Sequence, residues 1–207
     1  MTDHHVTGLI LAGGRGGRMG GIDKGLVNLK GLPLVHHTLK RLQMQEGLQF
    51  KEIMIVANRN IDKYETLGVQ VWSDNTPTFE GPLAGFQTGL EKCKTSLLLT
   101  VPCDSPFFPL NLADRMRSAL IAEDAEMAIA ATRDPDGRTQ PHSVFCLMKC
   151  SLLSSLQEFM GSGERKVSAW TALHKTISVP FQITGATQAA FLNANTPEDL
   201  SRLESLA

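Results

Sequence analysis

Short apolar runs alternate with segments of helical spacing through the first 132 residues, and this alternation restricts the fold more than any other feature of the chain. The apolar runs predict strands over residues 6–12, 52–58, 69–74, 96–106 and 125–132. The spacing between them predicts helices over residues 33–45, 62–68, 82–93 and 111–123, the last with Asn111 as a candidate cap. A strand–helix unit repeated four times predicts a mostly parallel sheet with helices on both faces and right-handed crossovers.

The pattern loosens after residue 132. Strands are expected over residues 142–148 and 176–181, and helices over residues 151–163 and 165–175. The final segment, 189–206, reads as a strand leading into a helix that Thr196 caps, with Pro197 at its first position. No internal repeat, low-complexity tract or linker divides the 207 residues, so we predict a single domain over residues 1–207.

The composition excludes some classes of partner. A formal net charge of −1 gives no support for general binding to nucleic acid or to anionic membranes, so any anion site must be local. The sequence has no run near the roughly 18 apolar residues of a membrane span and no signal-peptide pattern. We interpret the four cysteines, Cys93, Cys103, Cys146 and Cys150, as free thiols, and we expect a cytoplasmic protein.

The glycine-rich stretch LAGGRGGRMGGIDKG, residues 11–25, follows the first predicted strand. It is not a P-loop, because Lys24 is followed by Gly25 rather than by Ser or Thr. It is not a dinucleotide fingerprint either, because Met19 stands where that motif needs its third glycine. Its position still favours a nucleotide, since doubly wound sheets bind ligands at the carboxyl ends of their strands.

The residue types of this loop suit a triphosphate. Glycines let backbone N–H groups approach phosphate oxygens closely. Arg18 can hold a phosphate through two hydrogen bonds, and Lys24 supplies a point charge. Arg15 lies outside this core, and we interpret it as solvated. The alternative is a surface loop with solvated cations.

Polar residues follow three of the predicted strands. Asn58, Asp74 and Asp104 stand where strand ends converge, and Asp104 directly follows a fully apolar run. One carboxylate at this place suits Mg²⁺, which takes few protein ligands and completes its shell with phosphate and water. The alternatives are a helix or turn cap for Asp104 and simple loop polarity for Asn58 and Asp74.

The segment EGPLAG, residues 80–85, offers a second close approach of the backbone, with Gly81, Pro82 and Gly85 as candidates to line a base or ribose pocket. No motif for a serine, cysteine or zinc-dependent hydrolase is present. The predicted chemistry therefore rests on cations and one acid.

Five motifs together resemble the molybdenum cofactor guanylyltransferase family, which belongs to the Rossmann-like nucleotidyltransferases. They are LAGGxxxRMGxxDK, GPLAG, PCDxP, GERKV and NxNTPEDL, and the match runs from Leu11 to Leu200. The resemblance implies an α/β fold, with a Rossmann-like, mostly parallel sheet, helices on both faces and a single three-layer domain. It implies transfer of GMP from GTP to the terminal phosphate of molybdopterin, with release of pyrophosphate and with Mg²⁺ as the cofactor.

The resemblance also implies roles for individual residues. Residues 1–110 would mainly bind nucleotide, through Leu11, Ala12, Gly13, Gly14, Lys24, Asn58, Asp74 and Asp104. Residues 111–207 would mainly face the pterin, through Gln140, Pro141, Arg165, Lys166, Asn193 and Asn195. Arg18, Lys24 and Asp104 would be catalytic, and Asp104 would hold the metal. Some relatives carry Arg-Asp-His-Pro where this chain has Arg138-Thr139-Gln140-Pro141, so no histidine is assigned to the pterin side.

Three alternatives stay open at this point. A cytidylyltransferase acting on the same pterin, or a sugar-phosphate nucleotidyltransferase, would share the nucleotide half. A non-catalytic adaptor that binds nucleotide and pterin is a different class, although Asp104 favours an enzyme. We expect a monomer whose partners are GTP, molybdopterin, pterin-handling proteins and molybdoenzyme chaperones.

Overall fold

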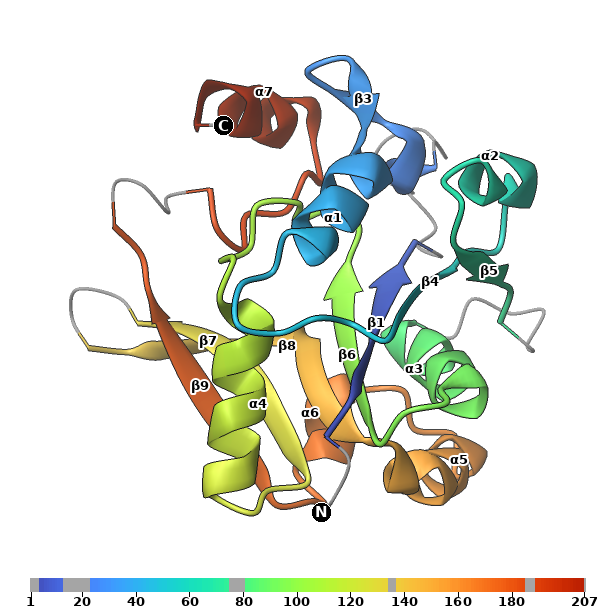
Figure 1. Ribbon diagram of the computed structural model, residues 1–207, viewed down its shortest axis with the longest axis vertical. Coiled ribbons are helices and arrows are strands. Elements are labelled where there is room, and N and C mark those ends of the chain that lie inside the picture. Colours follow the sequence, from blue (N-terminus) through green and yellow to red (C-terminus); the bar gives the residue numbers. More distant parts are fainter. Residues whose placement is uncertain (1–3, 13–22, 75–80, 134–136, 185–188, 207) are drawn as a thin grey trace.

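The computed structural model describes residues 4–12, 23–74, 81–133, 137–184 and 189–206 (Figure 1). Its main sheet has seven strands in the order β5 (Gln70–Trp72), β4 (Glu52–Val56), β1 (Val6–Leu11), β6 (Leu97–Pro102), β8 (Thr139–Lys149), β7 (Met127–Arg133) and β9 (Thr176–Gln182). β8 runs antiparallel to both of its neighbours, whereas the other neighbouring pairs are parallel. The predicted mostly parallel sheet is confirmed.

Alternate side chains of the central strands enter two different helical layers. Val6 and Ile10 of β1 share a core with buried residues of α1 (Leu34–Gln43) and α4 (Leu112–Ala122). Leu9 of the same strand shares the opposite core with α3 (Pro82–Lys92), α5 (Leu153–Gly161) and α6 (Val167–Thr171). The two-residue period of a strand thus produces one three-layer domain, and Figure 1 shows α4 in front of the sheet.

The carboxyl ends of the strands carry smaller elements. A 3₁₀ turn, η2 (Lys24–Leu26), leads into the hairpin of β2 (Asn28–Leu29) and β3 (Leu32–Pro33), and α2 (Ile61–Glu65) lies between β4 and β5. The last helix, α7 (Pro197–Leu206), packs near β2, where Leu203 shares a small core with Leu29 and Ala194. Figure 1 shows α7 and β3 together at this end of the molecule.

The prediction of a strand at the start of segment 189–206 is wrong. Ala189, Ala190 and Phe191 are buried, which explains the apolar signal, but they form turns and not a strand. Phe191 has a φ of 64°, a left-handed conformation incompatible with a strand, and its ring packs against His142 and Phe145. The other predicted strands and helices are present, although the helix expected over 165–175 is only the five residues of α6, and a 3₁₀ turn, η3 (Cys150–Leu152), precedes α5.

The order of the strands places a switch point between β1 and β6. The chain leaves β1 toward β4 and β5, and then returns across the sheet through α3 to form β6 on the other side of β1. Crevices at such points, outside the carboxyl ends of the strands, are where open α/β sheets bind ligands. Among the described residues, no helix is both long enough and apolar enough to cross a membrane.

The start of α4 is capped from another helix. Asn111 occupies the predicted cap position, but its side chain makes no capping hydrogen bond. Gln45, which follows α1, supplies the contact instead: the backbone N–H of Ala113 donates to Oε1 of Gln45 at 2.9 Å. The Nε2 of Gln45 donates to the carbonyl of Pro109 at 3.0 Å. This buried amide therefore joins α1 to the beginning of α4.

We expect Gln45→Ala to lower the free energy of unfolding by about 1–2 kcal/mol, because it leaves the buried N–H of Ala113 without its acceptor. Asn111→Ala is the matched control and should cost less than about 0.5 kcal/mol. Urea denaturation of the two variants measures both values. Equal losses would show that Gln45 does not cap α4.

Candidate functional site

A cavity of about 660 Å³ lies at the switch point. Its floor comes from the ends of the parallel strands: Leu11 and Ala12 at β1, Val56 at β4, and Pro102 to Asp104 at β6. Asp74, after β5, lies at one side, and residues 140–145 of β8 form the opposite wall. Five neighbouring strands therefore contribute to one cavity, as the strand order requires.

The beginning of α3 closes this cavity along one edge. Gly81, Pro82 and Gly85 all line it, as predicted. Gly81 has a φ of 78°, a conformation that favours glycine, and Pro82 starts the helix. A Cβ at Gly85 would lie 2.5 Å from Cδ2 of Leu11, so a side chain there would require Leu11 to shift or α3 to move from β1. The GPLAG motif thus allows close contact between α3 and the strand that ends at the cavity.

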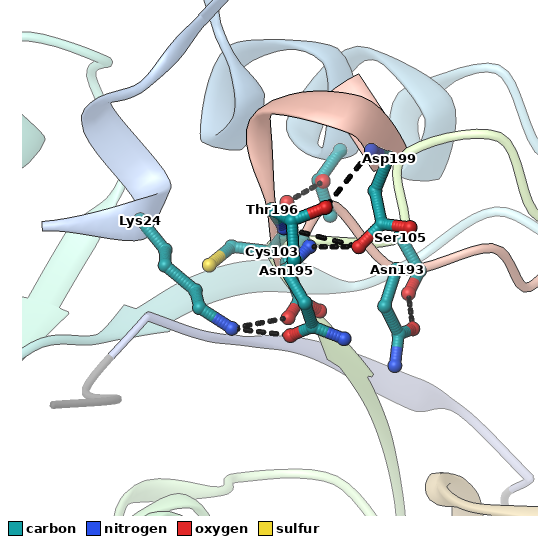
Figure 2. A network of polar contacts seen from close by, with 9 residues as sticks. Lys24, Cys103, Ser105, Asn193, Asn195, Thr196 and Asp199 are labelled. Carbon is teal, nitrogen blue, oxygen red and sulfur yellow. Dashed lines mark hydrogen bonds and ion pairs between the residues drawn. The ribbon is translucent and has the colours of Figure 1, made fainter. Parts of the chain in front are cut away.

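Lys24 contacts one residue predicted to bind nucleotide, Asp104, and one predicted to face the pterin, Asn195 (Figure 2). Its Nζ lies 3.4 Å from Oδ2 of Asp104 and 2.5 Å from Oδ1 of Asn195. The side chains of Lys24 and Asp104 are 20% and 17% exposed, so water screens this pair less than it screens a surface ion pair. The three residues come from segments separated by up to 171 positions in the sequence.

The NANTPEDL motif forms a folded loop that presents its asparagines. Oδ2 of Asp199 accepts hydrogen bonds from the backbone N–H groups of Asn195 and Thr196, and Oγ1 of Thr196 accepts one from Asp199. This reciprocal arrangement confirms the predicted cap at Thr196. The backbone N–H of Ala194 donates to the carbonyl of Asp104 at 2.8 Å, which fixes the loop to the end of β6.

Asn193 is held separately, and Figure 2 shows it beside Ser105, with Asn195 between it and Lys24. The hydroxyl of Ser105, directly after Asp104, donates to Oδ1 of Asn193. Asn193 lines both the large cavity and a smaller neighbouring one, and Asn195 lines the smaller one. Both predicted asparagines are therefore at the site, and each is oriented by a different partner.

Asn58 and Asp74 are brought together, as the convergence of strand ends predicts. Nδ2 of Asn58 donates to Oδ2 of Asp74 at 2.7 Å, and the backbone N–H of Asp74 donates to Oδ1 of Asn58 at 2.9 Å. Thr88 of α3 donates to the other carboxylate oxygen at 3.4 Å. Asp74 lines the cavity and Asn58 does not, so Asn58 acts here by orienting Asp74.

A second cavity of about 280 Å³ adjoins the first and shares Gln140, His142 and Asn193 with it. Asn195, Asp199 and Arg202 complete its polar lining. Gln140 and Pro141, both predicted to face the pterin, line the large cavity. Arg165 and Lys166 are not among the residues that line either cavity, and Nη1 of Arg165 donates to the carbonyl of Met160 at 2.7 Å.

His142 was not predicted from the sequence, because the histidine that some relatives carry in this motif corresponds to Gln140 here. The imidazole of His142 lies where the two cavities meet and stacks on Phe191 with ring centroids 4.5 Å apart. Its Nε2 lies 3.0 Å from Oγ1 of Thr132. Burial lowers the pKa of His142, so the ring is neutral at pH 7 and offers a flat, uncharged wall. Its position directly after the Gln-Pro pair was the available signal.

The hydrogen bonds that hold the residue before Lys24 were not predicted from the sequence either. Asp23 is buried and accepts hydrogen bonds from the hydroxyl of Tyr64 at 2.5 Å and from Nδ2 of Asn60 at 3.0 Å. Burial and the hydrogen bond to Asp23 raise the pKa of Tyr64, which therefore stays a donor. A Cβ at Gly25 would overlap the Tyr64 hydroxyl. The Asp-Lys-Gly sequence thus positions Lys24 through residues on both sides of it.

Gly13, Gly14, Arg15 and Arg18 lie outside the described residues. The assignments of Gly13 to guanine or ribose, of Gly14 and Arg18 to the triphosphate, and of Arg15 to solvent stay predictions. Within the described chain, the arrangement places a cation, a carboxylate and two amides at the junction of two cavities. Such a junction can hold an anionic group and a divalent cation next to each other.

We expect Tyr64→Phe to lower the free energy of unfolding by about 1–3 kcal/mol, because it leaves a buried carboxylate oxygen without its donor. It should also weaken triphosphate binding, since the turn that carries Lys24 loses a support. Urea denaturation and calorimetric titration with a nucleoside triphosphate measure the two effects. Unchanged stability and binding would exclude a supporting role for Tyr64.

Comparisons with known proteins identify the relatives of this chain. Residues 8–177 match the MobA-like NTP transferase domain family. A molybdenum cofactor guanylyltransferase from Bordetella petrii is 54% identical over 199 residues, covering 96% of each chain. Another from Albidiferax ferrireducens is 52% identical over 204 residues, covering 97% of this chain and 96% of the relative.

Solved structures support the fold. Molybdopterin-guanine dinucleotide biosynthesis protein A from Archaeoglobus fulgidus aligns with a TM-score of 0.72 at 19% identity, covering 97% of both chains. A 4-diphosphocytidyl-2C-methyl-D-erythritol synthase from Anaerococcus prevotii aligns with a TM-score of 0.72 at 16% identity, covering 97% of this chain and 95% of the other. At such identities the likeness concerns the fold alone. The sequence matches and the fold together show that the chain belongs to the molybdenum cofactor guanylyltransferase family, with a MobA-like nucleotidyltransferase domain.

Proposed function

We propose that this protein transfers GMP from GTP to the terminal phosphate of molybdopterin, with release of pyrophosphate. The observation that carries the proposal is the meeting of Lys24, Asp104 and Asn195 at the junction of two connected cavities. A transfer between two substrates needs two adjoining binding sites with charge neutralisation between them. The names of the relatives describe the same reaction class.

The larger cavity is the proposed nucleotide site. Leu11 and Ala12 bring backbone groups to its floor, and Gly81 and Gly85 leave room beside α3. The carboxylate of Asp74, oriented by Asn58, can accept hydrogen bonds from the N–H groups of guanine. Lys24 also lines this cavity, where it would contact the phosphates together with Gly14 and Arg18.

Asp104 fits a Mg²⁺ role by its chemistry and its place. Its carboxylate stands at the end of a buried strand, lines the nucleotide cavity and has one oxygen beside Lys24. Mg²⁺ binds through one or two carboxylates together with phosphates and water, so a single protein carboxylate is sufficient. Mg²⁺ bound there would supply positive charge to the α-phosphate and to the leaving pyrophosphate.

The described side chains then have defined tasks. The attacking group is a phosphate monoester, which is already anionic at neutral pH and needs no strong general base. Lys24 would move from Asp104 and Asn195 to the phosphates and neutralise charge as pyrophosphate leaves. Asn193 and Asn195, fixed by Ser105 and by the Asp199 cap, would orient the acceptor for in-line attack.

The smaller cavity is the proposed acceptor site. It offers Arg202 as a cation and the His142–Phe191 stack as a flat wall. A bicyclic pterin matches this combination, because its planar ring can lie on the stack and its carbonyl and ring nitrogen can accept from a guanidinium. We propose that residues 1–110 mainly bind nucleotide and residues 111–207 mainly bind pterin.

Competitive binding distinguishes the rival functions. We expect GTP to bind more tightly than CTP or ATP, and GTP, Mg²⁺ and molybdopterin together to yield pyrophosphate and a guanine dinucleotide. Equal affinity for the three nucleotides would contradict guanylyl transfer. Binding of both substrates without pyrophosphate release would favour the adaptor. A cytoplasmic monomer that works with pterin-handling proteins and molybdoenzyme chaperones is part of the proposal.

Asp104→Asn should abolish Mg²⁺-dependent turnover, a loss of roughly a hundred-fold or more, because the neutral amide cannot balance the charge of the metal. The fold should persist, since the carbonyl of Asp104 still accepts from Ala194. Pyrophosphate release measures turnover and circular dichroism checks the fold. Asp62→Asn, an exposed carboxylate on α2, is the control and should turn over normally. Normal turnover of Asp104→Asn would refute the metal role.

Arg202→Gln should raise the KM for molybdopterin about ten-fold and leave the KM for GTP unchanged, because it removes a charged donor from the smaller cavity alone. Arg202→Lys should recover part of the loss. Lys63→Gln, which removes an exposed charge from α2, controls for net charge. Steady-state kinetics, with each substrate varied in turn, give the KM for molybdopterin and the KM for GTP of the wild type and of each variant. A rise confined to the KM for GTP would move Arg202 to the nucleotide side.

A further inference from the structure

Two cysteines that are far apart in the sequence meet at the amino-terminal edge of β6. Cys93 directly follows α3, and Cys150 directly follows β8. Their sulfurs lie 3.1 Å apart, although 57 positions separate the residues. A disulfide needs about 2.05 Å between sulfurs, so an approach of about 1 Å would complete the bond. Both side chains are half-buried and reduced.

The surroundings make the two sulfurs unequal. Cys93 has polar neighbours, including the hydroxyl of Thr95 at 3.3 Å. The hydrogen bond from Cys150 is the largest cause that lowers the pKa of Cys93 to about 6, while the same contact raises the pKa of Cys150. At neutral pH Cys93 is therefore mainly the thiolate, which is the reactive form, and Cys150 is the thiol beside it.

The other two cysteines differ from Cys93 in their burial and in the direction of their pKa shifts. Cys103 and Cys146 are buried, and burial raises the pKa of each. Buried thiols with raised pKa values react slowly with oxidants. The chain therefore contains one pair suited to oxidation and two internal controls.

We propose that Cys93 and Cys150 form a reversible disulfide when the protein meets a hydroperoxide. The Cys93 thiolate attacks one peroxide oxygen, the O–O bond breaks, and hydroxide or alkoxide leaves, which gives a sulfenic acid. The sulfur of Cys150 then attacks the sulfur of Cys93 and loses its proton, and the sulfenic oxygen leaves as water. With hydrogen peroxide, two thiols and one peroxide yield one disulfide and two waters. A dithiol reductant reverses the change.

The location gives the bond a structural consequence. The beginning of α3 and the first half of β8 form two walls of the nucleotide cavity, and the cysteines follow the far ends of these two elements. A disulfide would join the ends of the two walls and close a long loop. Closing such a loop reduces the freedom of the unfolded chain and stabilises the fold. This inference concerns the thiols alone and does not depend on the proposed reaction.

Treatment of the purified protein with hydrogen peroxide, followed by alkylation of the remaining thiols, tests the proposal. We expect intact mass to show two thiols protected from alkylation, and peptide mapping to show Cys93 linked to Cys150. The oxidised protein should unfold several degrees higher than the same sample after reduction with dithiothreitol. Cys150→Ser should give no link and a Cys93 sulfenic acid that dimedone traps.

Two further variants complete the test. Cys93→Ser should leave Cys150 open to alkylation after peroxide treatment, and Cys146→Ala, the matched control, should form the link as the wild type does. Four thiols that still alkylate after oxidation would overturn the proposal. A link that includes Cys103 or Cys146, or wild-type Cys93 oxidised to the sulfinic acid without a link, would also overturn it.

Discussion

The contact of Lys24 with Asp104 and Asn195 is the interaction on which the organisation of the site depends. It joins the turn after the glycine loop, the end of β6 and the loop before α7. In the described structure these charges and amides satisfy one another. A charged ligand can replace these partners, because Lys24 and Asp104 both line the cavity that the ligand would enter. The same residues can therefore hold the site together and also bind an anionic ligand.

Other hydrogen bonds, either buried or from the backbone, hold the segment that carries each of these three residues. Asp23 and Tyr64 hold the turn of Lys24, and the backbone of Ala194 fixes the C-terminal loop to β6. The Asp199 cap orients Asn195. Because these hydrogen bonds already hold the groups in place, the site loses little conformational entropy when a substrate binds. They also explain why several residues near the site are polar without lining a cavity.

Much of the fold follows from local sequence. Apolar runs and helical spacing located most of the elements, and the NTPED pattern located the cap at Thr196, because these signals lie within a few residues of one another. The start of segment 189–206 misled, since burial of Phe191 among other rings looks the same in sequence as burial within a strand. The prediction that Asn111 caps α4 was wrong for a similar reason, because Gln45 contacts the same helix end from a distant segment.

The sequence by itself determined much of the inventory of the described site: Lys24, the acids after the strands and the late asparagines. It also determined that strand ends would converge, since that follows from parallel pairing. Only the tertiary structure decided the partnerships, such as Lys24 with Asn195 and Cys93 with Cys150. The physical reason is that these contacts join segments far apart along the chain. Their distances are set by how the layers pack, and no local periodicity records that packing.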